Sequence, residues 1–190
     1  MKGVALLLVD VINDMDFAGS QGLVRQAIPM ARRLAKLKAR ASKAGVPVIY
    51  INDNFGQWRS DFRRLVDHCL TDDVPGREVA AMLRPADDDY FVLKPKHSAF
   101  YGTTLDTLLE FLGVRTIVLT GIAGNICVLF SANDAYMRDY RLIVPRDCTV
   151  SNTPEINTHA LRQMKTALKA DIRPSSTIRF GQKALGGRKR

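Results

Sequence analysis

Three residues suited to nucleophilic and acid–base chemistry stand at or shortly after the ends of apolar runs in the sequence. They are Asp10, Lys94 and Cys127. Continuous runs of Val, Ile and Leu are typical of strands buried in a parallel sheet. Because such sheets bind ligands at the carboxyl ends of their strands, we expect the three side chains to meet in one crevice.

These residue types fit a thiol nucleophile with two activating partners. The thiolate is the reactive form, and an ordinary thiol has a pKa of about 8.5. We expect Cys127 to lie in the first turn of a helix, where the helix dipole favours negative charge, and Lys94 to add a cation. Asp10 would accept the thiol proton and return it to a leaving group. Singly, each residue has an ordinary structural explanation, so the prediction depends on their joint placement.

The remaining sequence alternates predicted strands and helices. Apolar runs predict strands at 4–9, 46–51, 91–93, 116–119 and 142–144, and helical periodicity predicts helices at 25–44, 103–112, 125–140 and 154–170. Gly45 and Gly113 are suited to ending helices, and Thr153 to capping one. This alternation indicates a three-layer, Rossmann-like α/β fold with a doubly wound sheet.

Residues 52–89 interrupt this alternation with many charges, two prolines and only short helical pieces. A long irregular connection in a compact domain is often a functional loop or lid. Phe55 and Trp58 could wall a small apolar pocket there, or Trp58 could anchor the loop to the core. We name Phe17, Asn54 and Trp58 as candidate pocket residues.

Composition indicates one globular domain, which we place at 1–180. The chain has 190 residues, 46% of them hydrophobic and 25% charged. We find no membrane-length apolar run and no export signal. We therefore expect a cytoplasmic protein with no membrane partner, in which Cys69, Cys127 and Cys148 are free thiols. Of the three, Cys69 and Cys148 lack the strand-to-helix setting and are expected to be packing residues.

The last ten residues, 181–190, form a basic, Gly-rich tail that we expect to be mobile. The formal net charge of the chain is +9, and the tail contributes four cations and no acid. A basic tail can bind nucleic acid or an acidic partner, but a solvated chain end is the simpler interpretation. No helix-turn-helix or basic-aromatic motif accompanies it, so we expect no nucleic-acid partner.

The sequence resembles the isochorismatase-like cysteine hydrolases, which include nicotinamidases, N-carbamoylsarcosine amidases, ureidoacrylate amidohydrolases and biuret hydrolases. The matching motifs are LLLVDVINDMDF around Asp10, KPKHSAFYGTTLDTLL around Lys94 and LTGIAGNICVLFSANDAYMRDY around Cys127; VPRDC near residue 147 also fits. The resemblance covers residues 3 to about 180. The occurrence of the three motifs in this order makes it specific.

The resemblance implies a six-stranded, mostly parallel sheet and an Asp-Lys-Cys triad at Asp10, Lys94 and Cys127. It also implies a cis peptide between Ile122 and Ala123, and an oxyanion hole made by the amides of Ala123 and Cys127. It implies a homo-oligomer, either a dimer or a tetramer. The implied activity is hydrolysis of a C–N bond in a small amide, carbamoyl or ureido substrate through a thioester. From the residues of this chain we expect no cofactor.

Two departures from family patterns bear on the substrate. Nicotinamidases have an Asp-x-His motif after the second strand to hold a metal, whereas this chain has Asp53-Asn54-Phe55. Its histidines, at 68, 97 and 159, show no ligand spacing, so we expect no catalytic metal. Many relatives have Thr where this chain has Gly124. We interpret His97, near Lys94, as a local structural residue, with a Cys-His pair as the alternative.

Two other functions are less compatible with these residues. An isochorismatase-fold binding protein could use its basic tail to hold an acidic partner, but a complete triad favours an enzyme. A dinucleotide-binding oxidoreductase would need a Gly-rich turn after the first strand, and VDVINDMDF lacks G-x-G-x-x-G.

Overall fold

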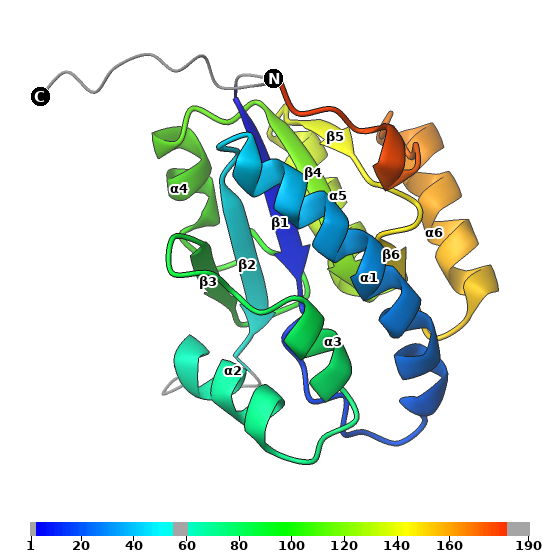
Figure 1. Ribbon diagram of the computed structural model, residues 1–190. Helices are drawn as coiled ribbons and strands as arrows, with labels where there is room; N and C mark the ends of the chain where they lie inside the picture. The colour runs from blue at the N-terminus through cyan, green and yellow to red at the C-terminus, as the bar shows by residue number, and fades with distance from the viewer. Residues whose placement is uncertain (1–2, 55–60, 182–190) are drawn as a thin grey trace, which may run out of the picture.

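A computed structural model of the chain describes residues 3–54 and 61–181 and shows a three-layer α/β sandwich (Figure 1). The described strands are β1 (Val4–Val9), β2 (Val48–Asp53), β3 (Tyr90–Lys94), β4 (Thr116–Ile122), β5 (Arg141–Ile143) and β6 (Thr149–Val150). The helices are α1 (Gln21–Lys43), α2 (Phe62–Thr71), α3 (Arg77–Met82), α4 (Leu105–Phe111), α5 (Leu129–Met137) and α6 (Pro154–Ala167), with a π-helical turn, η1 (Gly124–Val128), and a 3-10 turn, η2 (Ser175–Thr177).

The sheet is parallel in every pairing of the described strands, in the order β3-β2-β1-β4-β5, with β6 beside the end of β4. The chain moves outward from β1 to β3 and then returns to place β4 on the other side of β1. The strand order therefore reverses between β1 and β4. In open α/β sheets the carboxyl ends of the strands form a crevice at this point.

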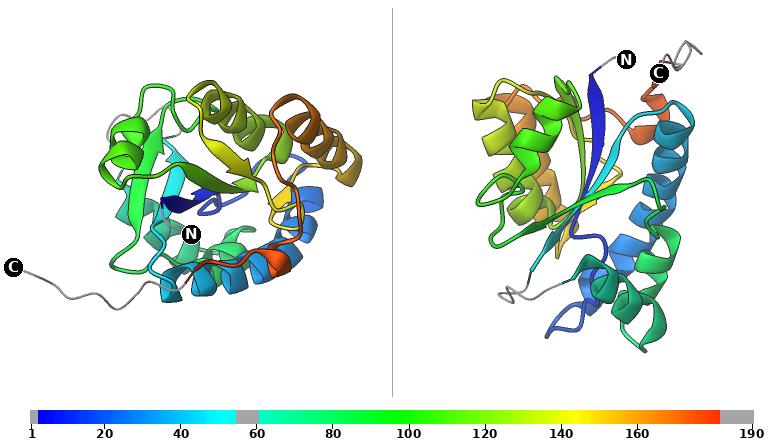
Figure 2. Two further views of the ribbon diagram at one scale, coloured as in Figure 1. Left: turned by 90° about the horizontal axis from the view of Figure 1, so that it is seen from above. Right: turned by 90° about the vertical axis from the view of Figure 1, so that its left-hand side faces the viewer.

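Helices cover both faces of the sheet (Figure 2). Side chains alternate along β1, so Leu6 and Leu8 pack in the core beneath α1, α2 and α3, whereas Leu7 and Val9 pack beneath α4, α5 and α6. Burial on both faces explains why β1 is a continuous apolar run without a polar residue. The predicted doubly wound, six-stranded α/β fold is confirmed.

Most predicted elements are present, but several boundaries differ. β2 begins at Val48, two residues later than predicted, because the amide of Val46 still donates to the carbonyl of Ala41 in α1. β4 extends to Ile122, and the helix predicted at 125–140 is divided into η1 and α5. Thr153 caps α6 as expected, accepting a hydrogen bond from the amide of Ile156 at 3.3 Å.

The irregular region 52–89 contains two short helices, α2 and α3, which pack on the α1 side of the sheet. Asp61 caps α2 by accepting from the amide of Arg63 at 2.8 Å. Residues 55–60, with Phe55 and Trp58, lie outside the described residues, as does the tail beyond Gly181. Within the described ranges, no helix is long and apolar enough to cross a bilayer.

The end of β4 lies unusually close to β1 at Gly121. This residue pairs with Val9 and has a φ of 116°, in the region that favours glycine. A Cβ atom at this position would lie 2.1 Å from the carbonyl oxygen of Val9. Gly121 thus permits the two central strands to place Asp10 and the Cys127 turn beside each other.

Replacing Gly121 with alanine should therefore destabilise the fold strongly. Left-handed backbone and overpacking together should cost about 3–5 kcal/mol in free energy of unfolding. Gly113→Ala is the matched control, because Gly113 also has positive φ (64°) but no atom within 4 Å of the point that a Cβ would occupy; its cost should be about 1–2 kcal/mol. Urea denaturation followed by circular dichroism measures both losses. Equal losses would show that the approach of β1 does not constrain position 121.

Candidate active site

Asp10 is positioned at the carboxyl end of β1 by its backbone. Its amide donates to the carbonyl of Ile51 at 2.8 Å, and its φ is 51°. The carboxylate is buried, and its Oδ1 accepts from the amide of Asp53 at 2.9 Å. The end of β2 therefore fixes the orientation of the Asp10 side chain.

Lys94 is the last residue of β3, and its side chain is fully buried. Its Nζ lies 2.9 Å from Oδ2 of Asp10 and 3.5 Å from Oδ2 of Asp53. Its carbonyl accepts a hydrogen bond from the amide of Asn54 at 3.0 Å. Two carboxylates thus surround one buried ammonium group. This role of Asp53 was not predicted from the sequence, although its position after the second apolar run, beside Asn54, indicated a residue at a strand end.

Cys127 lies in η1, which continues directly into α5, so it stands in the first turn of a helical segment as predicted, although that turn is π-helical. Its side chain is half-buried, and its Sγ lies 3.7 Å from Nζ of Lys94. The peptide between Ile122 and Ala123 is cis. The carbonyl of Ala123 accepts from the amides of Ile126 and Val128, which holds the turn closed around the cysteine. The three predicted triad residues therefore converge on one site from β1, β3 and the end of β4.

Ser151 and Asn157, which were not predicted from the sequence, support the η1 turn through hydrogen bonds. Ser151 Oγ accepts from the amide of Asn125 at 3.1 Å and lies 3.1 Å from Oδ1 of Asn157. Asn157 Nδ2 in turn donates to the carbonyl of Thr149 at 3.1 Å. A Cβ atom at Gly124 would lie 2.1 Å from Oδ1 of Asn157. Asn157 thus leaves no room for a side chain at position 124.

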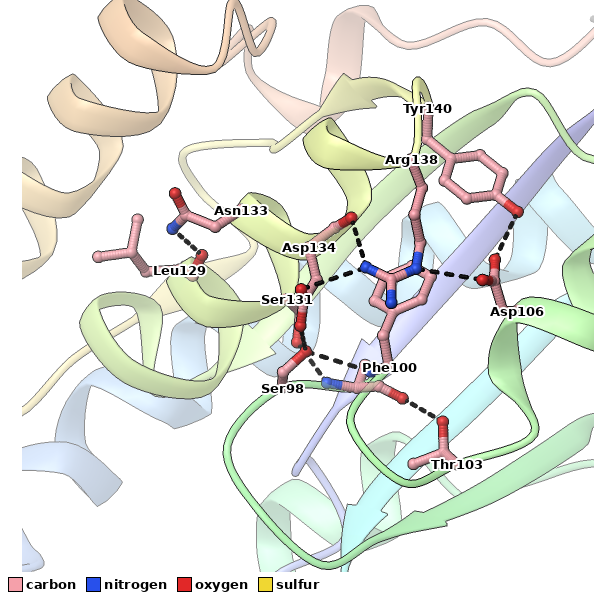
Figure 3. A network of polar contacts seen from close by, with 11 residues as sticks. Ser98, Phe100, Thr103, Asp106, Leu129, Ser131, Asn133, Asp134, Arg138 and Tyr140 are labelled. Carbon is pink, nitrogen blue, oxygen red and sulfur yellow. Dashed lines mark hydrogen bonds and ion pairs between the residues drawn. The ribbon is translucent and has the colours of Figure 1, made fainter.

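A second polar network joins the segment after Lys94 to helix α5. Ser131 Oγ donates to the carbonyl of Cys127 at 2.6 Å and accepts from the amide of Ala99 at 2.9 Å. Ser98 Oγ donates to the Asp134 carboxylate. Figure 3 shows Ser98, Ser131 and Asp134 close together where the two segments meet. They fix the chain that follows Lys94 against the helix that follows Cys127.

Arg138 extends this network at the surface (Figure 3). Its guanidinium bridges Asp134, at 3.2 Å, and Asp106, at 3.1 Å, and packs over the ring of Phe100. Tyr140 also donates to Asp106, at 3.3 Å. These contacts connect α4, α5 and the segment between β3 and α4. They stabilise the packing of these elements around Cys127 without contacting its sulfur.

The triad is strongly coupled electrostatically. Burial raises the pKa of the Asp10 carboxyl, against the opposing effect of Lys94. Burial alone would lower the pKa of Lys94, but Asp10, Cys127 and Asp53 together outweigh this effect, and the pKa is raised. Lys94 is therefore charged at neutral pH.

Burial, reinforced by Asp10, raises the pKa of the Cys127 thiol to about 12, despite the opposing effect of Lys94. The cation of Lys94 therefore does not bring the pKa of this thiol below its ordinary value. The low-dielectric site and the adjacent carboxylate outweigh one cation. The arrangement instead suits a thiol whose proton moves to Asp10 as the sulfur attacks.

His97 lies closer to the nucleophile than a purely local structural role requires. Its Nδ1 is 3.9 Å from Sγ of Cys127, and its exposed ring packs against Phe130 with the ring centroids 5.6 Å apart. The His97 side chain therefore lies on the solvent side of the thiol, whereas Asp10 and Lys94 lie on its buried side. This contact makes the Cys-His pair a geometric alternative to the triad.

The other candidate residues have varied surroundings. Phe17 is exposed in the loop after β1, whereas Asn54 is buried beside β3. Cys69 and Cys148 are fully buried in the core on the α1 side, which confirms that they are packing residues. Residues 3–54 and 61–181 contain no group of three His, Cys, Asp or Glu side chains suited to holding a metal ion.

Comparison with known proteins identifies the family. The isochorismatase domain profile matches residues 4–173. YaaI of Bacillus subtilis, an uncharacterised isochorismatase family protein, is 44% identical over 92% of this chain and 95% of its own length. RutB of Methylorubrum extorquens, a ureidoacrylate amidohydrolase, is 29% identical over 85% of this chain and 75% of its own.

Solved structures agree with the profile. The crystal structure of N-carbamoylsarcosine amidase from Thermoplasma acidophilum superposes with a TM-score of 0.74 at 30% sequence identity, covering 94% of this chain and 99% of that one. The profile match, the sequence similarity and the shared architecture all extend over nearly the whole chain. The protein therefore belongs to the isochorismatase family.

Proposed function

We propose that the protein is a cysteine-dependent hydrolase that cleaves a C–N bond of a small amide, carbamoyl or ureido compound through a thioester. The observation that carries this proposal is the placement of the Lys94 ammonium 2.9 Å from Asp10 and 3.7 Å from the Cys127 sulfur. A base, a cation and a thiol in mutual contact are the groups that nucleophilic acyl transfer requires.

In the first half of the reaction, Cys127 Sγ attacks the carbonyl carbon while its proton passes to Asp10. The carbonyl oxygen takes the negative charge, and the amides of Ala123 and Cys127 stabilise it. When the tetrahedral intermediate collapses, the C–N bond breaks and Asp10 gives its proton to the nitrogen. Ammonia or an amine leaves, and the acyl group remains on sulfur as a thioester.

In the second half, Asp10 accepts a proton from water as the water oxygen attacks the thioester carbon. Collapse of this second intermediate breaks the C–S bond, and the proton on Asp10 returns to the sulfur. The product is a carboxylic or carbamic acid, and the enzyme is restored. Dividing the displacement into two steps means that water never has to displace nitrogen directly.

Lys94 acts in this scheme as a fixed cation. It offsets the buried carboxylates of Asp10 and Asp53 and orients Asp10 towards the sulfur. It also lowers the pKa of Cys127 relative to the same site without a cation. The ammonium is fully buried, so water screens these effects little.

The names of the relatives support the substrate class. RutB is a ureidoacrylate amidohydrolase, and the matched Thermoplasma protein is an N-carbamoylsarcosine amidase. Both names describe C–N cleavage at a carbamoyl or ureido carbon. We extend that chemistry to this chain because it belongs to the same family and has its three candidate catalytic residues at the ends of its strands. The screen described next identifies the individual substrate.

The test of this function is an ammonia-release screen over amides, carbamoyl compounds and ureides. A substrate should be turned over by the wild type and by Cys69→Ser, because Cys69 is fully buried in the core. Cys127→Ser should lose turnover by about 10³-fold or more, since a hydroxyl is a weaker nucleophile at this pH. Mass spectrometry of the trapped enzyme should show the acyl group on Cys127. Turnover retained by Cys127→Ser would contradict the proposal.

Asp10 should govern the acid limb of the pH profile. Only the ionised carboxylate can accept a proton, and burial raises its pKa above the ordinary 3.8. Activity should therefore be complete above the raised pKa and should fall as the pH decreases through it. Asp10→Asn should lower kcat/KM by about 10²-fold or more. Asp53→Asn is the control: it changes the other carboxylate near Lys94 and should retain the acid limb.

Lys94 can be tested through the alkylation of Cys127 by iodoacetamide. Lys94→Met removes the cation that lowers the thiol pKa, so alkylation at pH 8 should slow by about tenfold, the equivalent of one pKa unit. Lys96→Met, at an exposed lysine two residues away, should leave the rate unchanged. Peptide mass spectrometry gives the rate at each cysteine, and circular dichroism confirms folding. A folded Lys94→Met protein with the wild-type rate would remove Lys94 from thiol activation.

A further inference from the structure

A groove of about 570 Å³ lies between helices α1 and α6 and does not include the triad residues. The strand β6, which lies between α1 and α6 in Figure 1, contributes Thr149 and Val150 to its lining. The volume is within the range of small-molecule sites, which is about 300–1,000 Å³. The proposed hydrolysis assigns no role to this groove.

The lining of the groove is strongly basic. Its cations come from α1, from the segment before β6 and from α6, and they are Arg33, Arg146, Arg162 and Lys165. None of the four forms an ion pair with a described residue. Four exposed cations from three segments around one concavity repel one another unless an anion lies between them.

The lining contains one acidic residue, Asp147, so four basic side chains still leave a net positive charge. Both oxygens of Asp147 accept hydrogen bonds from Ser175, one from the backbone amide at 2.7 Å and one from the hydroxyl at 2.9 Å. Asp147 is therefore committed to fixing the C-terminal segment. The basic side chains of the groove retain their capacity for an external ligand.

A second observation comes from the floor of the groove. Thr149 is 2% exposed, and its Oγ1 has no hydrogen-bond partner among the described residues. A buried hydroxyl without a partner costs about 1–3 kcal/mol. The Oγ1 atom is itself covered, so a ligand oxygen would give this hydroxyl an acceptor only when the side chains over it shift. Charge and hydrogen-bonding capacity thus favour the same kind of ligand.

We propose that this groove binds a small polyanion, either a phosphorylated or a polycarboxylate metabolite. Arg33, Arg146, Arg162 and Lys165 provide its counter-charges, and Thr149 donates to one of its oxygens. The guanidinium groups suit both chemistries, because their paired N–H donors match phosphate and carboxylate oxygens. The site is separate from the proposed hydrolytic centre and does not depend on its reaction.

The position of the groove connects it physically to the nucleophile turn. Asn157 lines the groove and is also the residue that lies against Gly124 and bonds with Ser151. Ser151 in turn holds the amide of Asn125, two residues before Cys127. An anion beside Asn157 is therefore separated from the turn by two hydrogen-bonded side chains.

Isothermal titration calorimetry with pyrophosphate and with citrate, at constant ionic strength set by NaCl, tests the proposal. The wild type should bind at least one of them saturably with one site per chain. Preference for pyrophosphate would identify phosphorylated ligands, and preference for citrate would identify polycarboxylates. The double variant Arg162→Gln/Lys165→Gln should weaken binding by at least tenfold, and Thr149→Val should weaken it by several-fold.

The matched control is Arg25→Gln/Lys36→Gln, which removes two exposed cations of α1 that do not line the groove. It should bind within twofold of the wild type. Prior alkylation of Cys127 should also leave binding unchanged. Three results would overturn the proposal: no saturable binding of either anion at millimolar concentration, equal weakening in the control variant, or loss of binding on alkylation of Cys127.

Discussion

The burial of one ammonium group, that of Lys94, is the constraint on which the site depends. An unpaired charge inside a protein costs several kcal/mol, so the ends of β1 and β2 must supply Asp10 and Asp53 as partners. The amide of Asp53 then holds Asp10 in turn. This closed set of contacts aligns three strand ends and leaves one position beside the ammonium, which Cys127 occupies.

Cys127 is held by its backbone more than by its side chain. Ser131 fixes the carbonyl of Cys127, and Ser151 fixes the amide of Asn125. The two serines approach η1 from different segments, and neither touches the sulfur within the described contacts. The sulfur itself is therefore left to Lys94, Asp10 and His97. Such support leaves the reactive atom able to form and break bonds while its position stays fixed.

The convergence of Asp10, Lys94 and Cys127 could be predicted because each residue ends or closely follows an apolar run, and the carboxyl ends of parallel strands meet at one edge of the sheet. The same pattern predicted the central strands but could not reveal β6, which is two residues long and too short to show periodicity.

The π-helical turn also could not be predicted, because its residue spacing differs from that of an α-helix over a single turn only. The raised pKa of Cys127 depends on burial, which local sequence does not specify. Asn157 was missed because its role depends on contact with Gly124, more than thirty residues earlier.

The pairing of β1 with β4 has a consequence for synthesis of the chain. Val4 pairs with Thr116, so one edge of the most apolar strand has no partner until the ribosome has released residues well beyond the first hundred. Until then β1 can pair only with β2, and its other edge is open to neighbouring nascent chains. Pairing of two strands so far apart in the sequence also slows folding, because the chain entropy of the long loop is lost before the contacts between the strands form. Recovery of enzymatic activity after dilution from denaturant would therefore report the completion of the central sheet, and not the formation of its first half.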